Sequence, residues 1–377
     1  MARHLLEAIA TLVGTSIGAG ILGIPYVVAK AGFGMGLLNI LTIGFAILAV
    51  NLLLGEVVLR TDGKHQMIGY AEKYLGKPGR IIMVAAFLIS IYGALLAYTA
   101  VEGEVLHNIL GLPQFSLSLI FFAVMAALIF LGLEAIEESE LLLVALKVMF
   151  FGIMFLLVLA SGKMMMSNLQ LGTPAMLFIP YGVVLFAFLG FAAIPEMREE
   201  LEHDPALLKR AIIFGSLISL VIYVLFTLAV VAVNGINATP VAPTGLAFLG
   251  RGMVLASNLF AVLAMATSFL ALGLALKEMY QYDFGLNKHL AWLATCIIPL
   301  LGFLAGFTNF IALLGIVGAL AGGIEGILIV MIHWQASRGS ERAPEYKLPR
   351  NIALSSALVL LFILGIAHEL LKLVGMA

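Results

Sequence analysis

Four glycines and a proline interrupt the first apolar stretch of the chain, at residues 14–25, with the sequence GTSIGAGILGIP. Each glycine weakens a helix by roughly 1 kcal/mol and a proline by about 3 kcal/mol, and in a membrane every freed backbone group needs another partner. Free N–H groups from Gly18 to Gly20 suit a carboxylate, and the carbonyls near Gly14 and Thr15 suit an ammonium or another cation. We therefore predict a ligand site here, with close packing of small residues as the alternative.

A second stretch of this kind lies at residues 179–196, with the sequence IPYGVVLFAFLGFAAIPE. Its aromatic residues would line a side-chain pocket, together with Tyr92 or Tyr98 from an earlier apolar run. No charged residue lies within 14–25 or 186–194. A charged substrate side chain would need a buried opposite charge, so a neutral amino acid is predicted. The predicted substrate contacts are Thr15, Ser16, Gly18, Ala19, Gly20, Tyr92, Phe186, Phe188, Gly190 and Phe191.

A cation site is predicted beside the first break, and two occupants compete for it. Lys147 lies within an apolar run, where an ammonium must face protein because its insertion into a bilayer costs at least about 2.5 kcal/mol. Its expected partners are oxygens of Gly14 and Ser268, which would make it a titratable group for proton coupling. Sodium is the alternative occupant. Its five predicted oxygen donors are Gly14, Ile17, Ala264, Thr267 and Ser268, the last three on one helix face.

Two further interpretations of these charges stay open. Lys147 could extend to the cytoplasmic surface, and transport could be an uncoupled exchange. Glu56 is either a functional carboxylate or the ion-pair partner of Arg60 one turn later, and Glu325 has no evident partner in the sequence. The histidines lack ligand spacing, so we predict no metal site besides the sodium alternative, and no cofactor.

The elements that position these residues are membrane helices. The chain has 377 residues, of which 63% are hydrophobic and 11% charged, with a mean hydropathy of +1.14. A soluble domain would have about a quarter of its residues charged. Each run of about 20 apolar residues can cross the hydrocarbon core. We expect about eleven spans, at 5–30, 34–59, 81–109, 115–133, 140–161, 172–195, 207–234, 246–276, 289–306, 308–333 and 351–374.

Charge distribution predicts the orientation in a cell membrane. With a cytoplasmic amino terminus, 15 of the 20 Lys and Arg residues lie on the inner side and four on the outer side, as the positive-inside rule requires. An odd span count then places the carboxyl terminus outside. The thinly spread basic residues argue against nucleic-acid binding. A single cysteine excludes an internal disulfide, and no cleaved signal peptide is expected.

The two interrupted spans are the first and the sixth. Breaks five spans apart are typical of transporters built from two inverted repeats, with the substrate between them. We predict a single transmembrane domain over residues 1–377. It would contain a first five-helix repeat (1–162), an inverted second repeat (172–335) and an extra helix (351–374).

These residues resemble the hydroxy and aromatic amino acid permeases, which carry tyrosine and tryptophan in bacteria. The resemblance rests on the pattern of residues 14–25 and on further matches along the first half of the chain. These are Glu56, Ala97-Tyr98, Gly103-Glu104, Lys147, Gly190-Phe191 and Ile194-Pro195. The chain differs at Ala192-Ala193, where the family tends to have more polar residues.

The resemblance implies the wider amino acid, polyamine and organocation superfamily and a LeuT-type fold. Proton-coupled members have a lysine at the place of Lys147, and the sodium alternative is similar to the second sodium site of LeuT-type carriers. We predict a symporter that imports a neutral amino acid, aromatic ones included, by alternating access. An enzyme is not expected because nucleophile, zinc and phosphate-loop motifs are missing. A channel or a sensor is the weaker alternative.

Overall fold

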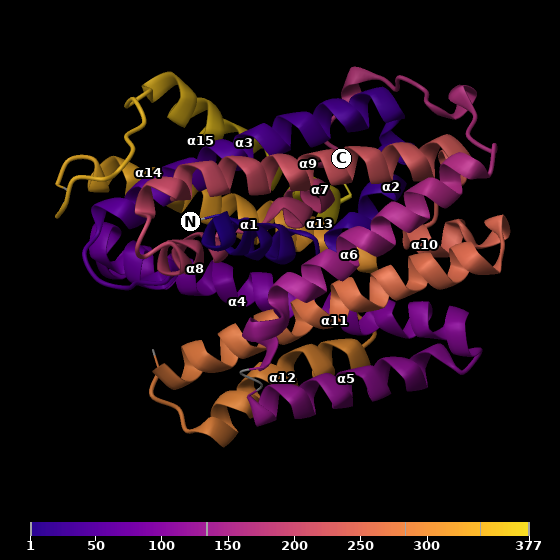
Figure 1. Ribbon diagram of the computed structural model, residues 1–377, viewed down its shortest axis with the longest axis horizontal. Coiled ribbons are helices and arrows are strands. Elements are labelled where there is room, and N and C mark those ends of the chain that lie inside the picture. The colour runs from indigo at the N-terminus through magenta and orange to yellow at the C-terminus, as the bar shows by residue number, and fades with distance from the viewer. Residues whose placement is uncertain (1, 133–134, 283, 340, 376–377) are drawn as a thin grey trace.

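The computed structural model describes residues 2–132, 135–282, 284–339 and 341–375, and this part of the chain is built from helices (Figure 1). Short 3-10 turns lie between some of them, and a π-helical turn (Val317–Gly322) joins α13 to α14. The α-helices are α1 (Ala2–Ser16), α2 (Gly20–Ala31), α3 (Phe33–Arg60), α4 (Met67–Leu110), α5 (Gln114–Leu131), α6 (Ala135–Ala160), α7 (Tyr181–Phe188), α8 (Ala193–Glu200), α9 (Leu208–Asn234), α10 (Ala242–Gly245), α11 (Arg251–Tyr282), α12 (Lys288–Leu304), α13 (Phe310–Ile316), α14 (Gly323–Ala336) and α15 (Ile352–Leu373).

Glycine and asparagine fix several helix ends. Gly111 and Gly132 follow α4 and α5 with φ of 71°, a left-handed conformation that disfavours side chains. At the opposite ends, asparagine side chains accept hydrogen bonds of 3.0–3.1 Å from the third backbone N–H of α12, α13 and α15. Such caps satisfy donors that the helix itself leaves unpaired.

The all-helical membrane architecture is confirmed, but the count of eleven spans is not. Among the described residues, nine helices are long and apolar enough to cross a membrane, or ten when α1 and α2 are joined as one bent span. The predicted span at 289–306 corresponds to α12, which has 17 residues and is shorter than the others. Residues 60–80, which lie between two of the predicted spans, are also partly helical, because α4 begins at Met67 and bends at Gly76.

Burial separates a central group of helices from peripheral ones. In their most apolar stretches, 78% of the residues of Tyr181–Glu200 and 72% of Phe310–Ala336 are buried, against 28% of α15. α1 packs on α6, α8 and α9, and α2 packs on α3, α7 and α9. α5 and α12 lie together at one edge of the molecule (Figure 1). Both interrupted spans therefore lie in the centre, where a ligand would be shielded from lipid.

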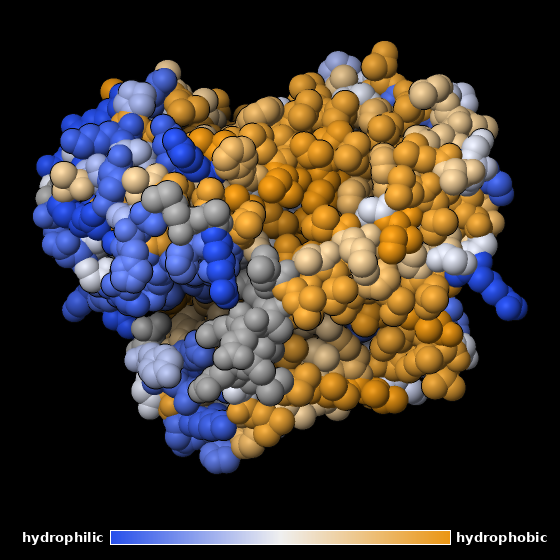
Figure 2. All heavy atoms as spheres, in the orientation of Figure 1, coloured by the Kyte–Doolittle hydropathy of each residue, from blue (hydrophilic) through white to orange (hydrophobic). Residues whose placement is uncertain are grey.

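The surface has two chemically distinct parts. Figure 2 shows hydrophilic residues gathered at the end that carries α8, the start of α4 and the segment after α14. Apolar side chains cover most of the remaining visible surface. Large apolar residues that are exposed include Phe45, Ile120 and Leu156. Such a broad exposed apolar surface fits contact with lipid rather than water.

Candidate functional site

The first break is a sharp bend between α1 and α2. α1 ends at Ser16, α2 begins at Gly20, and their axes differ by 55°. Between them the backbone closes a tight turn, in which the Gly18 N–H donates to the Ser16 carbonyl at 2.9 Å. The predicted interruption of the first span is thus present, with the cluster of glycines at its centre.

The N–H groups that are available to a carboxylate at this break are not all the ones predicted. Gly18 already uses its N–H within the turn, so it is not available to a carboxylate. Among the described residues, no hydrogen bond is found for the N–H groups of Ala19 and Gly20, because the start of a helix lacks carbonyls one turn earlier. Ala19 and Gly20, rather than Gly18, therefore offer N–H groups that a carboxylate could use.

The second break separates α7, which ends at Phe188, from α8, which begins at Ala193. Leu189 has an extended conformation, with φ of −64° and ψ of 114°. The Ala193 N–H then donates to the Gly190 carbonyl at 3.1 Å and restarts the helix. The sixth predicted span is thus broken, as the first is.

The two breaks are in direct contact, and glycine makes the contact possible. A Cβ atom on Gly20 would lie 2.5 Å from the Ala187 Cα atom, so the backbones of α2 and α7 meet there. A Cβ atom on Gly190 would lie 2.9 Å from the Ser16 Oγ atom. Real Cβ atoms do not approach so closely, so both positions need glycine for this packing.

Lys147 lies against the carbonyl end of the first break. Its Nζ atom is 3.3 Å from the carbonyl oxygens of both Gly14 and Ile17, and its side chain is buried. The predicted partner Gly14 is present. Ile17, which was expected to bind sodium, is the second partner, in place of Ser268. The ammonium thus occupies two of the five oxygens of the sodium alternative.

The α11 residues of that alternative have other hydrogen bonds. The Thr267 hydroxyl donates to the Leu263 carbonyl at 2.8 Å and lies 3.3 Å from the Ala264 carbonyl. The Ser268 Oγ atom is buried, with no hydrogen-bond partner found among the described residues. It lies next to the first break, because a Cβ atom on Gly18 would be 2.9 Å away from it.

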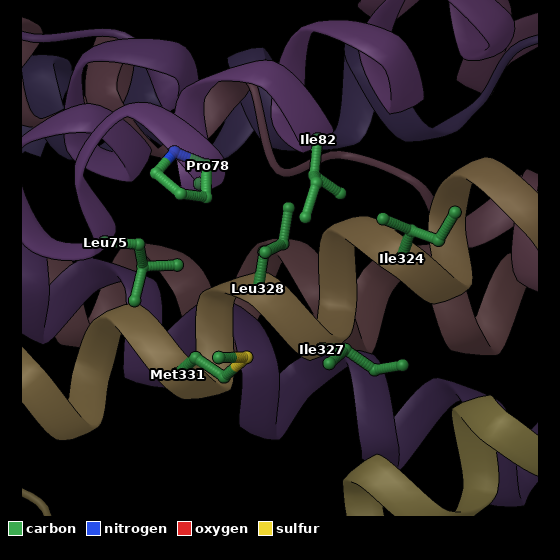
Figure 3. Close-up of a pocket in the computed structure, with 8 residues that line it drawn as sticks. Leu75, Pro78, Ile82, Ile324, Ile327, Leu328 and Met331 are labelled. Carbon is green, nitrogen blue, oxygen red and sulfur yellow. The ribbon is translucent and has the colours of Figure 1, made fainter.

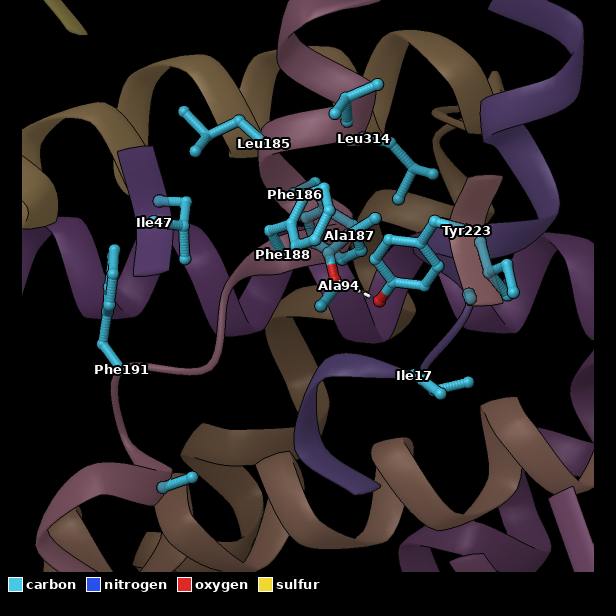
Figure 4. Close-up of a cluster of buried hydrophobic side chains, with 14 of the residues drawn as sticks. Ile17, Ile47, Ala94, Leu185, Phe186, Ala187, Phe188, Phe191, Tyr223 and Leu314 are labelled. Atoms are coloured by element: carbon cyan, nitrogen blue, oxygen red, sulfur yellow. Dashed lines mark hydrogen bonds between the residues drawn. The ribbon is translucent and has the colours of Figure 1, made fainter. Parts of the chain in front are cut away.

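The aromatic residues of the second break are all buried, and Figure 4 shows Phe191 apart from Phe186 and Phe188. Phe186, Phe188 and Phe191 are at most 8% exposed. The Tyr92 hydroxyl instead lies 2.6 Å from the Tyr280 hydroxyl and donates to the Ala294 carbonyl at 2.9 Å, both outside the breaks. Tyr98 lies at the first break, since its hydroxyl would be 3.2 Å from a Cβ atom on Gly18.

Tyr223 of α9 joins the two breaks, and the sequence analysis did not identify it. Its hydroxyl lies 2.6 Å from the Ser16 carbonyl and 2.6 Å from the Ala187 carbonyl, and Figure 4 shows the second of these bonds. The side chain is fully buried, with its ring edge-on to Phe188 at 4.8 Å between centroids. A tyrosine within an apolar span was the available signal, because a buried hydroxyl needs a partner.

Glu56 is at the centre of a separate buried cluster, close to the hydrophilic end. Arg60 donates to its Oε1 atom at 2.6 and 2.8 Å. Its Oε2 atom accepts from the Leu348 N–H at 2.8 Å and lies 3.0 Å from the His333 Nε2 atom. Glu56 therefore has the predicted Arg60 partner and two more, which favours a structural role for this carboxylate.

A second buried lysine, Lys277 of α11, contacts the carboxyl end of another helix, α5. Its Nζ atom donates to the Ile129 carbonyl in the last turn of α5 at 2.7 Å. The Trp292 Nε1 atom donates to the Ala126 carbonyl of the same helix at 2.8 Å. The lysine satisfies a carbonyl of the last turn, which the helix leaves without a partner, whereas Ala126 lies one turn before the end.

An apolar groove lies elsewhere, between the first part of α4 and α14 (Figure 3). It is lined by Leu75, Pro78, Gly79, Ile82, Ile324, Ile327, Leu328 and Met331. These side chains offer no partner for an ammonium or a carboxylate. The backbone groups of the two breaks can supply both, so the breaks are the better candidate for an amino acid site.

This architecture defines a class of protein by its fold, the LeuT-type fold. The chain is similar to MhsT in complex with L-phenylalanine, with a TM-score of 0.72 and 15% identity over 99% of this chain and 98% of that one. It is also similar to Mhp1, a nucleobase-cation-symport-1 family transporter, with a TM-score of 0.66 and 15% identity over 98% of this chain and 90% of that one. At such low identity the similarity shows the fold.

The sequence identifies the family. The tryptophan/tyrosine permease family matches residues 1–371, and the chain belongs to it. The chain is 29% identical to tyrosine-specific transport system 1 of Haemophilus influenzae, over 92% of each chain. It is 27% identical to glutamine transporter 2 of Aliivibrio fischeri, over 82% of this chain and 83% of that one. The protein is therefore a multi-pass membrane transporter of an amino acid carrier family, and the family is not one of enzymes.

Proposed function

We propose that this protein imports a neutral amino acid by proton-coupled symport, with aromatic amino acids as the first substrates to test. The contact of Lys147 with the Gly14 and Ile17 carbonyls carries the proposal, because it places a titratable group against the first break. Protonated Lys147 stabilises the carbonyl end of α1, and loss of its proton weakens that contact. Proton uptake and release can thereby bias the arrangement of the break.

The substrate is proposed to lie between the two breaks. Its carboxylate would be held by the N–H groups of Ala19 and Gly20, at the positive end of α2. Phe186, Phe188 and Phe191 would contact its side chain, with Tyr98 in place of Tyr92. Thr15, Ser16, Gly18 and Gly190 complete the proposed contacts. The apolar surroundings favour a neutral side chain, and the names of the relatives include both tyrosine and glutamine carriers.

Sodium coupling is the alternative, and Ser268 is the observation that favours it. Its buried hydroxyl has no partner among the described residues and lies beside Gly18, as a sodium ligand would. A sodium ion on Gly14, Ile17, Ala264, Thr267 and Ser268 would have to displace the Lys147 ammonium from two carbonyls. The two cations repel each other, so simultaneous occupancy of these oxygens is unfavourable.

We also propose the predicted topology, in a bacterial inner membrane. The amino terminus would be cytoplasmic and the carboxyl terminus outside, with α12 crossing the membrane despite its shorter length. Residues 1–162 and 172–335 would be inverted repeats, and 351–374 an additional helix. The position of the two broken spans, one near the start of each repeat, supports this arrangement.

One experiment tests substrate and ion together. Purified protein in proteoliposomes is given a panel of labelled amino acids under separately imposed pH and sodium gradients. We expect concentrative uptake of neutral amino acids driven by an inward proton gradient without sodium. Uptake that requires sodium and fails in Thr267→Ala would favour the alternative, and uptake that neither gradient accelerates would indicate exchange.

A further inference from the structure

The hydroxyl of Tyr223 is the one side-chain group found to bond to both breaks in the described residues. Tyr223 belongs to α9, whereas Ser16 ends α1 and Ala187 lies in the last turn of α7. Both acceptors are carbonyls at the carboxyl ends of half-helices, where the helix itself supplies no donor. These two ends carry partial negative charge and repel each other when they are brought together.

We propose that Tyr223 is a positioning residue that holds the two breaks in register for the substrate. A phenol is neutral and has one proton, which the two carbonyls share, so it joins two negative helix ends without a buried ion. The Ser16 carbonyl has a second donor, the Gly18 N–H, at 2.9 Å. For the Ala187 carbonyl, the Tyr223 hydroxyl is the donor found among the described residues. Loss of this hydroxyl would therefore affect the end of α7 most.

Three neighbouring contacts fix the position of the two breaks relative to each other, and a ligand between them would depend on that position. Gly20 packs directly on Ala187, and Gly190 packs on Ser16, so both breaks already meet on either side of the phenol. Phe188, a proposed substrate contact, packs edge-on against the Tyr223 ring. The N–H groups of Ala19 and Gly20 lie within four residues of Ser16. A ligand that contacts both breaks at once thus depends on the bonds that Tyr223 makes.

The test is Tyr223→Phe, which removes the hydroxyl and keeps the ring on Phe188. Tyr181→Phe is the matched control, because Tyr181 is also buried and its hydroxyl has no partner found among the described residues. Hydrogen exchange is measured without substrate, in peptides that cover residues 14–22 and 185–193. We expect faster exchange in both segments for Tyr223→Phe alone. Exchange at wild-type rates would overturn the proposal.

Binding supplies the second measurement. We expect the Kd of labelled tyrosine or phenylalanine to rise about tenfold in Tyr223→Phe, the size of effect of one buried hydrogen bond. The melting temperature and the Kd of Tyr181→Phe should stay close to wild type. An equal fall in stability for both variants with unchanged affinity would assign the hydroxyl a packing role and overturn the proposal.

This inference rests on the proposed substrate site, and the two can fail separately. If the wild-type protein binds no amino acid, the proposed function fails, whereas the exchange measurement still decides whether Tyr223 orders the breaks. If Tyr223→Phe does not fold, 3-fluorotyrosine at position 223 keeps the hydroxyl and makes it a stronger donor. Slower exchange in the same segments is then expected, and unchanged exchange would overturn the proposal.

Discussion

Two buried lysines bind helix carbonyls in this molecule, in different settings. Lys277 makes one short bond, 2.7 Å, to the Ile129 carbonyl at the end of an uninterrupted helix. Lys147 makes two longer contacts, 3.3 Å each, to Gly14 and Ile17 at the centre of a broken span. Their side chains are similarly buried, at 5% and 3% exposure. Burial of an ammonium is therefore not what distinguishes a functional lysine here.

The two lysines differ in the other hydrogen-bond donors that bind carbonyls of the same helix end. At the end of α5, the Gly132 N–H donates to the Leu128 carbonyl at 3.1 Å, next to the carbonyl that Lys277 binds. At the first break, the carbonyls face another half-helix and a proposed ligand. The backbone N–H of Gly132 does not titrate, so the end of α5 keeps one donor even when Lys277 loses its proton, and we interpret this end as structural. A helix end whose donor can lose a proton can change with the transport cycle.

The largest effect is expected from Lys147→Met, compared with Lys277→Met. Methionine keeps much of the side-chain length and removes the titratable ammonium. We expect Lys147→Met to lose at least tenfold of proton-driven uptake in proteoliposomes, because the break no longer responds to protonation. Lys277→Met should instead cost about 1–3 kcal/mol of stability, from an unpaired buried carbonyl, and retain its dependence on the pH gradient.

The same pair of variants can contradict this comparison. If Lys147→Met keeps the wild-type response to an imposed pH gradient, Lys147 is a helix cap like Lys277. If both variants lose the response, the coupling does not depend on the position of the first break. Melting curves in detergent show whether each variant is folded before its uptake is compared.

Gly18→Val tests whether the first break is a ligand site or only a bent helix. The added Cβ atom would lie 2.9 Å from the Ser268 Oγ atom and 3.2 Å from the Tyr98 hydroxyl. We expect binding of labelled substrate to fall at least tenfold, because the break must shift to relieve these contacts. Gly252→Val is the control, since no atom lies within 4 Å of its added Cβ position. Wild-type affinity in Gly18→Val would place the substrate elsewhere.

Much of this arrangement could be predicted from local sequence. Glycines and prolines mark both breaks because their effect on a helix is local. Lys147 was identifiable because a charge within an apolar run needs a protein partner, and its contact with Gly14 is present. The all-helical architecture follows from the apolar runs and the inverted repeats from the position of the two breaks, whereas the LeuT-type fold was implied by the family resemblance.

The remainder depends on how helices rotate and pack. Tyr92 and Tyr98 lie on one helix, about 9 Å apart along its axis, and packing decides which of them faces the break. Tyr223 bonds carbonyls that are 207 and 36 residues away in the sequence, and an aromatic residue in an apolar span is otherwise ordinary. The Leu348 N–H that binds Glu56 lies 292 residues from it, in a segment without regular structure.

Glu56→Gln extends the comparison to a buried carboxylate with several partners. The change leaves the Arg60 guanidinium without its counter-ion in a site where Glu56 is fully buried. Breaking a buried pair by removing one partner costs about 3–5 kcal/mol, so we expect a clear fall in melting temperature. Substrate affinity of the folded fraction should be unchanged.

Glu72→Gln is the matched control for this change. Its ion pair with Arg80 is at the surface, with side chains 45% and 37% exposed, and such pairs contribute about 0–1 kcal/mol. If Glu56→Gln has the same melting temperature as Glu72→Gln but loses proton-driven uptake, Glu56 takes part in proton coupling together with Lys147. The structural role that its three partners indicate would then be wrong.

The smallest effect is expected where a carboxylate holds an exposed segment by a surface ion pair and a backbone hydrogen bond. Glu341 accepts from the Asp62 N–H at 2.8 Å and from Lys73 at 2.7 Å, which ties the segment after α14 to the start of α4. The hydrogen bond from Lys73 lowers the pKa of the Glu341 carboxyl. Its contribution is therefore complete above the unfolded-state pKa and is lost as pH falls through the lowered value.

A spin label reports this attachment directly. Lys347→Cys, in a Cys296→Ala background, places a label on the exposed part of the same segment. We expect the label to be slightly more mobile in Glu341→Gln than in the protein that keeps Glu341, when both are measured at pH 7. In acid the Glu341 carboxylate is protonated, so the two proteins should then show the same label mobility. A difference that persists in acid would assign the attachment to other contacts, such as the backbone bonds from Glu341 and Arg342 to the Arg60 carbonyl. The segment would then be held, like the Leu128 carbonyl of α5, by backbone N–H donors that do not titrate.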